Sequence, residues 1–284
     1  MTLRQKRILG QKVGNFFRFL FLAIYFLITV FPFFWMVSTA VKATQAEIYA
    51  FPVIYWPKQP TFQNFINIAI KGNFLTYFGN TFYYSMIGAL GGTFVAILAS
   101  YVLSRLRFKG RNVMLFLFLF TQMLPAFVGM APQYQMMSKL GMINTRTGII
   151  ILYLTSVIPY SVVTLRSFFD NVPVTLEEAA MIDGCGRMRS MWSIAVPLML
   201  PGIASTLIFD FVNLWNNLFT GILYLDSDHL KTVSVGLNAM IQKYDILWGE
   251  LMAGTLIAVL PTMILFALLR KYMIAGLTSG AVKG

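Results

Sequence analysis

Long apolar stretches alternate with short charged segments along the whole chain. A helix that spans a membrane needs about 20 mostly apolar residues, because the hydrocarbon core is about 30 Å thick and each residue rises about 1.5 Å. Six stretches meet this requirement, and only the fifth carries a charged residue, Asp210, away from its ends. The pattern predicts spanning helices at about 16–41, 76–104, 112–137, 147–166, 201–225 and 250–270.

The composition supports a membrane protein. Hydrophobic residues make up 58% of the 284 residues and charged residues 11%, whereas a soluble domain has about 25% charged residues. A single cysteine, Cys185, excludes a disulfide scaffold. We expect an all-α, polytopic membrane protein that forms one transmembrane domain over residues 1–284.

The basic residues predict the orientation of the chain. Most of the 22 Lys and Arg residues lie before the first span, in the second-to-third and fourth-to-fifth loops, and after the sixth span. Basic residues near helix ends stay on the cytoplasmic side, so both termini are expected there. The net charge of +12 is explained by membrane topology, and no nucleic-acid partner is expected.

The third predicted span contains two prolines, Pro125 and Pro132, with Gln122 nearby. Prolines inside a spanning helix release backbone groups that need other partners. Two interpretations remain open: a kinked helix that lines a polar path, with Gln122 facing it, or a kink that only improves packing.

The loop at 172–200 carries signals for a short cytoplasmic helix. Thr175 and Glu178 have the spacing of a capping box at a helix start. Gly184 stands where a left-handed residue ends a helix. We expect a helix of about eight or nine residues, followed by a second helical piece from 187 to about 196. The small and apolar side chains of the first, short helix suit a groove on a partner protein. The alternative is that this helix lies on lipid headgroups.

These residues resemble the EAA loop of ABC importer permeases. The positions that carry the resemblance are Glu178, Ala179, Ala180, Asp183, Gly184, Ile194, Pro197, Pro201 and Gly202. Val196 stands where the family pattern has Leu. Together with the stretches at 141–145 and 276–284, the loop resembles the carbohydrate-uptake branch, the inner permease partner of maltose- and glycerol-phosphate-type systems.

The resemblance implies a non-catalytic permease domain with no cofactor of its own, in a bacterial or archaeal inner or plasma membrane. It implies a second homologous permease subunit, two cytoplasmic ATP-binding subunits that hold ATP and Mg, and an extracytoplasmic solute-binding protein. The absence of a G-x-x-x-x-G-K-[ST] motif in the sequence is consistent with this. The residues implied to couple to the ATPase are Glu177, Glu178, Ala179, Ala180, Asp183, Gly184, Ile194 and Pro197. With them, the C-terminal residues Ser279 and Gly280 are implied to contact the ATPase.

A polar stripe is expected on the fifth span. At about 100° per residue, Asp210, Asn213 and Asn217 fall on one helix face, with Asn216 beside them. Such side chains suit the hydroxyl groups of a sugar on a translocation path. They also suit hydrogen bonds between helices, and both interpretations stay open.

The expected function is therefore import of a sugar or oligosaccharide, driven by ATP hydrolysis on partner subunits. The alternative is an ion-coupled secondary transporter of a polar solute. Such a transporter is expected to carry several intramembrane carboxylates or broken-helix repeats, whereas this chain has one such carboxylate. The only histidine, His229, lies in an outer loop, and no metal site or catalytic constellation is expected.

Overall fold

The computed structural model describes residues 3–241 and 245–279, and within these ranges every regular element is a helix. The chain divides into two compact units. The first comprises Met1–Gly72 and Met240–Ile257, and the second comprises Asn73–Ala239 and Ala258–Gly284.

The first unit contains one long helix and two short ones, α1 (Leu3–Ala40), α2 (Gln45–Ile48) and α3 (Gln63–Lys71), together with the first part of α14 (Trp248–Ser279). Amide side chains connect these segments. Asn64 donates hydrogen bonds of 2.8 Å to the carbonyls of Ala40 and Lys42, and Asn67 donates to Glu250 Oε1 at 3.1 Å. The α1 end, α3 and the α14 start are thus fixed to one another.

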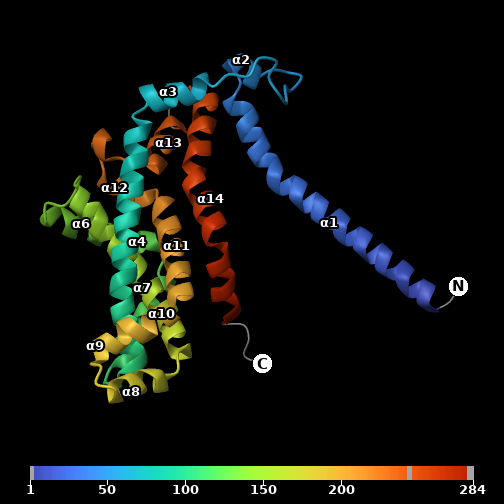
Figure 1. Ribbon diagram of the computed structural model, residues 1–284. Coiled ribbons are helices and arrows are strands. Elements are labelled where there is room, and N and C mark those ends of the chain that lie inside the picture. Colours follow the sequence, from blue (N-terminus) through green and yellow to red (C-terminus); the bar gives the residue numbers. More distant parts are fainter. Residues whose placement is uncertain (1–2, 242–244, 280–284) are drawn as a thin grey trace. The chain divides into compact units, whose positions relative to one another are not determined.

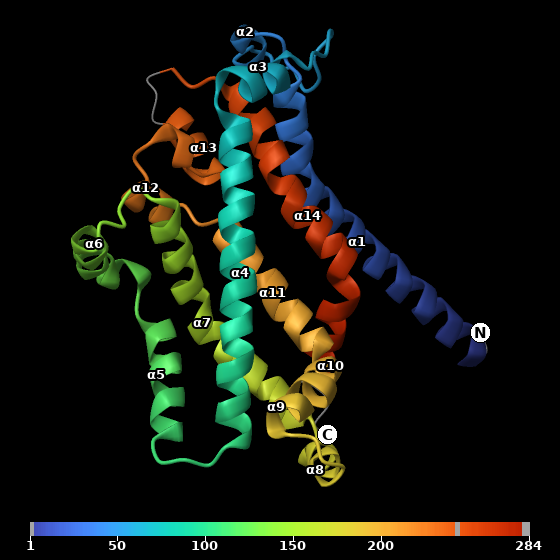
Figure 2. The same cartoon turned by 60° about the vertical axis from the view of Figure 1, so that its left-hand side comes forward.

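Three long helices form the centre of the second unit: α4 (Phe74–Arg105), α7 (Arg146–Asn171) and α11 (Leu200–Trp215). The helix α4 lies against both α7 and α11 (Figures 1 and 2). Gly88 permits this close approach, because a Cβ atom there would lie 2.8 Å from Leu214 Cδ1 and 2.9 Å from Tyr153 Cβ. Small residues let helices in a membrane pack closely in this way.

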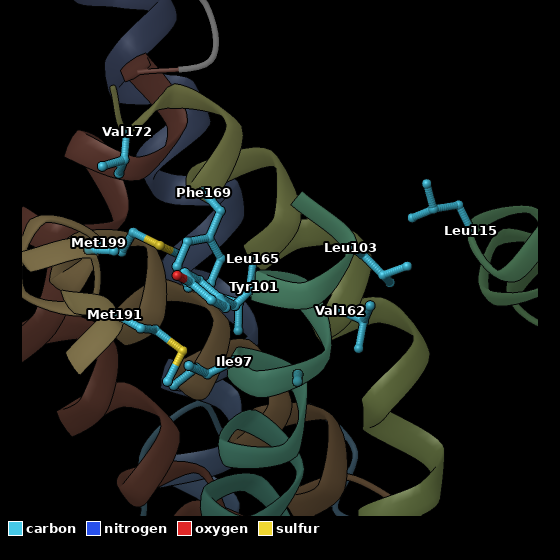
Figure 3. Packing of buried hydrophobic residues seen from close by; sticks show 12 residues of the cluster. Ile97, Tyr101, Leu103, Leu115, Val162, Leu165, Phe169, Val172, Met191 and Met199 are labelled. Carbon is cyan, nitrogen blue, oxygen red and sulfur yellow. The ribbon is translucent and has the colours of Figure 1, made fainter. Parts of the chain in front are cut away.

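Shorter helices surround this centre in the second unit. They are α5 (Arg111–Met123), η1 (Ala126–Gly129), α6 (Met130–Lys139), α8 (Val174–Ile182), α9 (Arg187–Ser190), the π-helical turn η2 (Met191–Ala195), α10 (Val196–Leu198), α12 (Phe219–Tyr224), η3 (Asp228–Leu230) and most of α13 (Val233–Ile241). Near α8 and α9, buried side chains from α4, α7 and the 191–199 segment form one cluster, including Tyr101, Phe169 and Met199 (Figure 3).

Among the described residues, four helical segments are long and apolar enough to cross a membrane: Gly14–Ala40, Phe74–Arg105, Arg146–Asn171 and Trp248–Leu268. They correspond to the first, second, fourth and sixth predicted spans. Two bent pairs raise the number of candidate spans to as many as six. The part of the chain that the structure describes therefore has four to six candidate spans.

The first bent pair confirms the kink predicted in the third span. The segments Arg111–Met123 and Phe127–Lys139 meet at 97°, and Pro125 lies between them with an extended ψ of 130°. Proline lacks the backbone N–H that would continue the helix.

The prediction of one continuous fifth helix over 201–225 was wrong. The helix α11 ends at Trp215, and α12 begins at Phe219. Asn217 Oδ1 accepts a hydrogen bond of 3.0 Å from the backbone N–H of Thr220. Asparagine side chains often bond backbone N–H groups at the start of a helix in this way. Because the chain breaks between 215 and 219, the residues after 215 leave the expected helix face.

Candidate functional site

The helix α8 has the predicted length and the predicted end. It comprises nine residues, Val174–Ile182, and Gly184 has a φ of 88°. Gly184 N–H donates to the carbonyl of Met181 at 3.2 Å, and Cys185 N–H donates to the carbonyl of Ala180 at 2.9 Å. This pair of bonds is a Schellman motif, which satisfies the last carbonyls of a helix.

The predicted capping box is absent, which corrects the expected helix start. The helix begins at Val174 after Pro173, and no side chain caps its first turn. Thr175 therefore lies inside the first turn rather than before it. Proline has a fixed φ, here −58°, and the helix starts directly after it.

Glu177 faces the interior of the protein. Its side chain is 3% exposed, and its Oε1 lies 2.7 Å from Arg105 Nε of α4, whose side chain is 7% exposed. Tyr101, also on α4, donates a hydrogen bond of 2.8 Å to Glu177 Oε2. Both carboxylate oxygens therefore have a partner, which a buried charge requires.

The same arginine connects α8 to the end of α7. Arg105 Nη2 donates to the carbonyl of Val172 at 2.9 Å, and Nη1 donates to Ser104 Oγ at 3.2 Å. Ser104 in turn donates to Asp170 Oδ1 of α7 at 2.6 Å. The start of α8 is thus held by α4 and by the segment that precedes it, so that α8 is a rigid projection.

The opposite side of α8 is exposed in the described part of the chain. Glu178, Ala179 and Asp183 are exposed, and the Ile182 side chain is 87% exposed. Ala180 is buried against the rest of the protein. The structure therefore separates the predicted coupling residues into an inward set, Glu177 and Ala180, and an outward set that includes Glu178 and Ile182.

The remaining coupling candidates lie beside α8 or beyond the described residues. The segments α9 and η2 pack against α8. Ile194 lies half-buried in η2, and Pro197 is exposed in α10. Ser279 ends α14, and Gly280 lies outside the described residues.

Asp210 lies between three helices of the second unit. The residue is 1% exposed, and its Oδ2 accepts hydrogen bonds from Thr93 of α4 at 3.0 Å and from Ser161 of α7 at 2.6 Å. These contacts are those expected of a group that bonds helices together. They favour that interpretation over an open polar path for this residue.

The other path candidates lie apart from Asp210. Asn213 and Asn216 are exposed, and Asn217 is half-buried. Asn216 donates to the carbonyl of Val212 at 2.8 Å. Gln122 of α5 is exposed and donates to the carbonyl of Phe118 at 3.2 Å. The described contacts do not bring Gln122 together with the asparagines.

Sequence reasoning missed two residues of the α8 site, Tyr101 and Arg105. In the sequence, Arg105 is one of the basic residues of the second-to-third loop, which indicate only the cytoplasmic side. No sequence signal connects it to Glu177, because the two residues are 72 positions apart. Within the described residues, no group of three or more His, Cys, Asp and Glu side chains has the arrangement of a metal site.

Comparison with known proteins identifies the family. The model for "Binding-protein-dependent transport system inner membrane component" matches residues 88–279. The chain is 36% identical to the inner membrane ABC transporter permease protein YcjP of Escherichia coli (strain K12), over 93% of this chain and 94% of that protein. It is 33% identical to the arabinooligosaccharides transport system permease protein AraQ of Halalkalibacterium halodurans, over 90% and 92% of the two chains.

The fold is also that of a solved transporter. A chain of a bacterial ABC transporter involved in the import of the acidic polysaccharide alginate superposes with a TM-score of 0.81 at 22% identity, over 96% of this chain and 99% of that chain. The described protein is thus a non-catalytic, multi-pass permease of the inner membrane. It belongs to the family of binding-protein-dependent transport system inner membrane components, the permease subunits of ABC transporters.

Proposed function

We propose that this chain forms part of the translocation path of an ABC importer for a sugar or oligosaccharide. The named substrates of its relatives support this class: arabinooligosaccharides for AraQ, diacetylchitobiose for DasC of Streptomyces coelicolor, and trehalose or maltose for MalG of Thermococcus litoralis. The exposed amides of Asn213 and Asn216, with Asn217 and Gln122, are the proposed polar lining of the path.

In the proposed topology the whole chain acts as one permease domain with six spans. The first bent pair counts as the third span, and the residues at about 201–225 count as the fifth. Both termini lie in the cytoplasm, as the basic residues predict. The helix α8 then projects from the cytoplasmic side. The proposed partners are a second homologous permease subunit, two ATP-binding subunits and an extracytoplasmic solute-binding protein.

The exposure of Ile182 on an anchored helix is the observation that carries the coupling role. Its side chain is 87% exposed, while the buried ion pair of Glu177 holds the other side of α8. A short helix fixed in this way transmits a displacement, whereas a flexible loop absorbs it. We propose that Glu178, Ala179, Ile182 and Asp183 dock into an ATP-binding subunit, and that Glu177 positions them.

Co-purification with the ATP-binding subunits tests this role. Ile182→Glu places a charge in the proposed contact, and we expect it to reduce retention of the ATP-binding subunits and ATP-driven sugar uptake at least tenfold. Ile70→Glu is the matched control, because Ile70 of α3 is 77% exposed and lies in the segment that the topology places outside. Normal retention in Ile182→Glu would contradict docking through this face.

A further inference from the structure

Four arginines line a hollow at the end of α4. The hollow has a volume of about 350 Å³ and lies among the α4 end, the start of α5, α8 and α9. Its charged lining consists of Arg105, Arg107, Arg111, Arg187, Glu177 and Glu178.

The charge of this hollow is not balanced by its own side chains. Arg105 forms its ion pair with Glu177. Arg107, Arg111 and Arg187 form no ion pair with any residue of the described chain, and Glu178 is the single unpaired acid of the lining. The Nε of Arg111 is buried without a hydrogen-bond partner among the described residues. The hollow therefore favours an anion, and arginine binds phosphate through two parallel hydrogen bonds.

Two further hollows near the charged one share lining residues in sequence. Arg107 and Arg111 also line a second hollow at the start of α5, together with Phe108. Phe108 in turn lines a groove of about 340 Å³ along α4 and α5, whose other walls include Val95, Val102 and Met114. Residues 107–111 therefore separate the cationic hollow from the apolar groove and line both neighbourhoods.

We infer that the cationic hollow and the neighbouring apolar groove together bind one anionic phospholipid of the cytoplasmic leaflet. The phosphate lies among Arg107, Arg111 and Arg187, and an acyl chain lies in the groove between α4 and α5. A soluble anion would contact the arginines but leave the apolar groove empty. A lipid with no net charge would fill the groove but would not balance the charge of the three unpaired arginines. The depth also fits, because in the proposed topology the second span ends next to Arg105, at the level of the headgroups.

The site places the lipid beside the proposed coupling helix. Glu178, in the middle of α8, and Arg187, the first residue of α9, line the same hollow as the lipid phosphate. Anionic lipid is therefore expected to fix the cytoplasmic end of α4 and α5 next to α8. This inference uses the proposed orientation of the chain, but not the identity of the transported solute.

Native mass spectrometry of the intact transporter complex in detergent tests the inference. The probes are phosphatidylglycerol, phosphatidylcholine and soluble glycerol phosphate. We expect the wild-type complex to retain phosphatidylglycerol, and the double variant Arg107→Gln/Arg111→Gln to bind it at least tenfold more weakly. Arg189→Gln is the matched control, because Arg189 is exposed in the same region but does not line the hollow.

A second variant tests the groove with the arginines intact. Val102→Phe fills the groove from a position that is 39% exposed, and we expect it to weaken phosphatidylglycerol binding severalfold. Equal retention of phosphatidylcholine, unchanged binding by either variant, or glycerol phosphate binding as tightly as the lipid would each overturn the inference. Lipid retention is measured without uptake, so the result is independent of the transport assay for Ile182→Glu.

Discussion

Arg105 of α4 and Glu177 of α8 form an ion pair of 2.7 Å in which neither side chain is more than 7% exposed. Charges removed from water are stabilised only when they are paired and hydrogen-bonded, and loss of one partner leaves an uncompensated charge. The pair therefore fixes α8 to α4 as long as both charges are present.

Removal of one charge of this pair should release α8. Arg105→Met leaves Glu177 buried without its cation, and we expect a loss of about 3–5 kcal/mol of local stability. The uptake rate should fall while basal ATP hydrolysis by the assembled complex persists, because α8 no longer transmits the displacement. The measurements are the thermal midpoint of the complex and the ratio of sugar transported to ATP hydrolysed.

The double variant Arg105→Met/Glu177→Met separates positioning from simple structural damage. It removes both charges, so we expect much of the lost thermal stability to return. The transport-to-hydrolysis ratio should stay low, because the anchor of α8 is still absent. Full recovery of this ratio would contradict a positioning role for the pair.

The effect of replacing Gly184 should depend on how readily the new residue adopts a positive φ. Its φ is 88°, and a Cβ atom there would meet no atom within 4 Å. The cost of Gly184→Val is therefore backbone strain of about 1–2 kcal/mol, and Gly184→Asn should cost less. We expect Gly184→Val to lower the coupling ratio more than Gly184→Asn does. Gly186→Val is the control, because Gly186 has an ordinary φ of −67° and equally open surroundings.

The helix pattern and the ends of several helices were predictable from the sequence. The second and fourth spans begin within two residues of their predicted starts, because charged or polar residues bound each apolar run. The end of α8 was predictable because Gly184 is a local signal. These features depend on residues close together in the chain.

The interior partners of the acidic residues were not predictable. The family resemblance implies that Glu177 couples to the ATPase. No feature of the neighbouring sequence predicts its contacts with Arg105 and Tyr101, which lie more than 70 positions away. The break after Trp215 was missed because no proline or glycine lies between 203 and 220. The Asn217 side chain instead accepts the backbone N–H of Thr220 at the start of α12, a contact that no local sequence signal predicts.

Substitution of Asp210 should distinguish helix bonding from a role in the path. Asp210→Ala removes the acceptor of Thr93 and Ser161, and interhelical hydrogen bonds in membranes contribute about 0.6–1.7 kcal/mol each. We expect a lower thermal midpoint and less assembled complex, with Asp210→Asn close to wild type because it keeps an acceptor oxygen. Normal assembly with abolished uptake in both variants would place Asp210 on the path instead.

Asn213→Ala tests whether an exposed asparagine of the same helix lines the translocation path. Asn213 is exposed on the same helix as the buried Asp210, so its loss should leave the thermal midpoint unchanged. If Asn213 lines the path, the KM for sugar uptake should rise severalfold. Unchanged uptake would remove Asn213 from the proposed lining.

A side chain at Gly88 should separate the three central helices. A Cβ atom there would lie 2.8 Å from Leu214 Cδ1 of α11 and 2.9 Å from Tyr153 Cβ of α7, and overpacking of this kind costs about 1–3 kcal/mol. Gly79→Val, on the same helix, meets nothing within 4 Å and controls for the general effect of valine in α4. We therefore expect Gly88→Val to reduce the yield and thermal midpoint of the complex, with Gly79→Val near wild type. Equal stability of the two variants would show that α4, α7 and α11 pack less closely at Gly88 than these distances require.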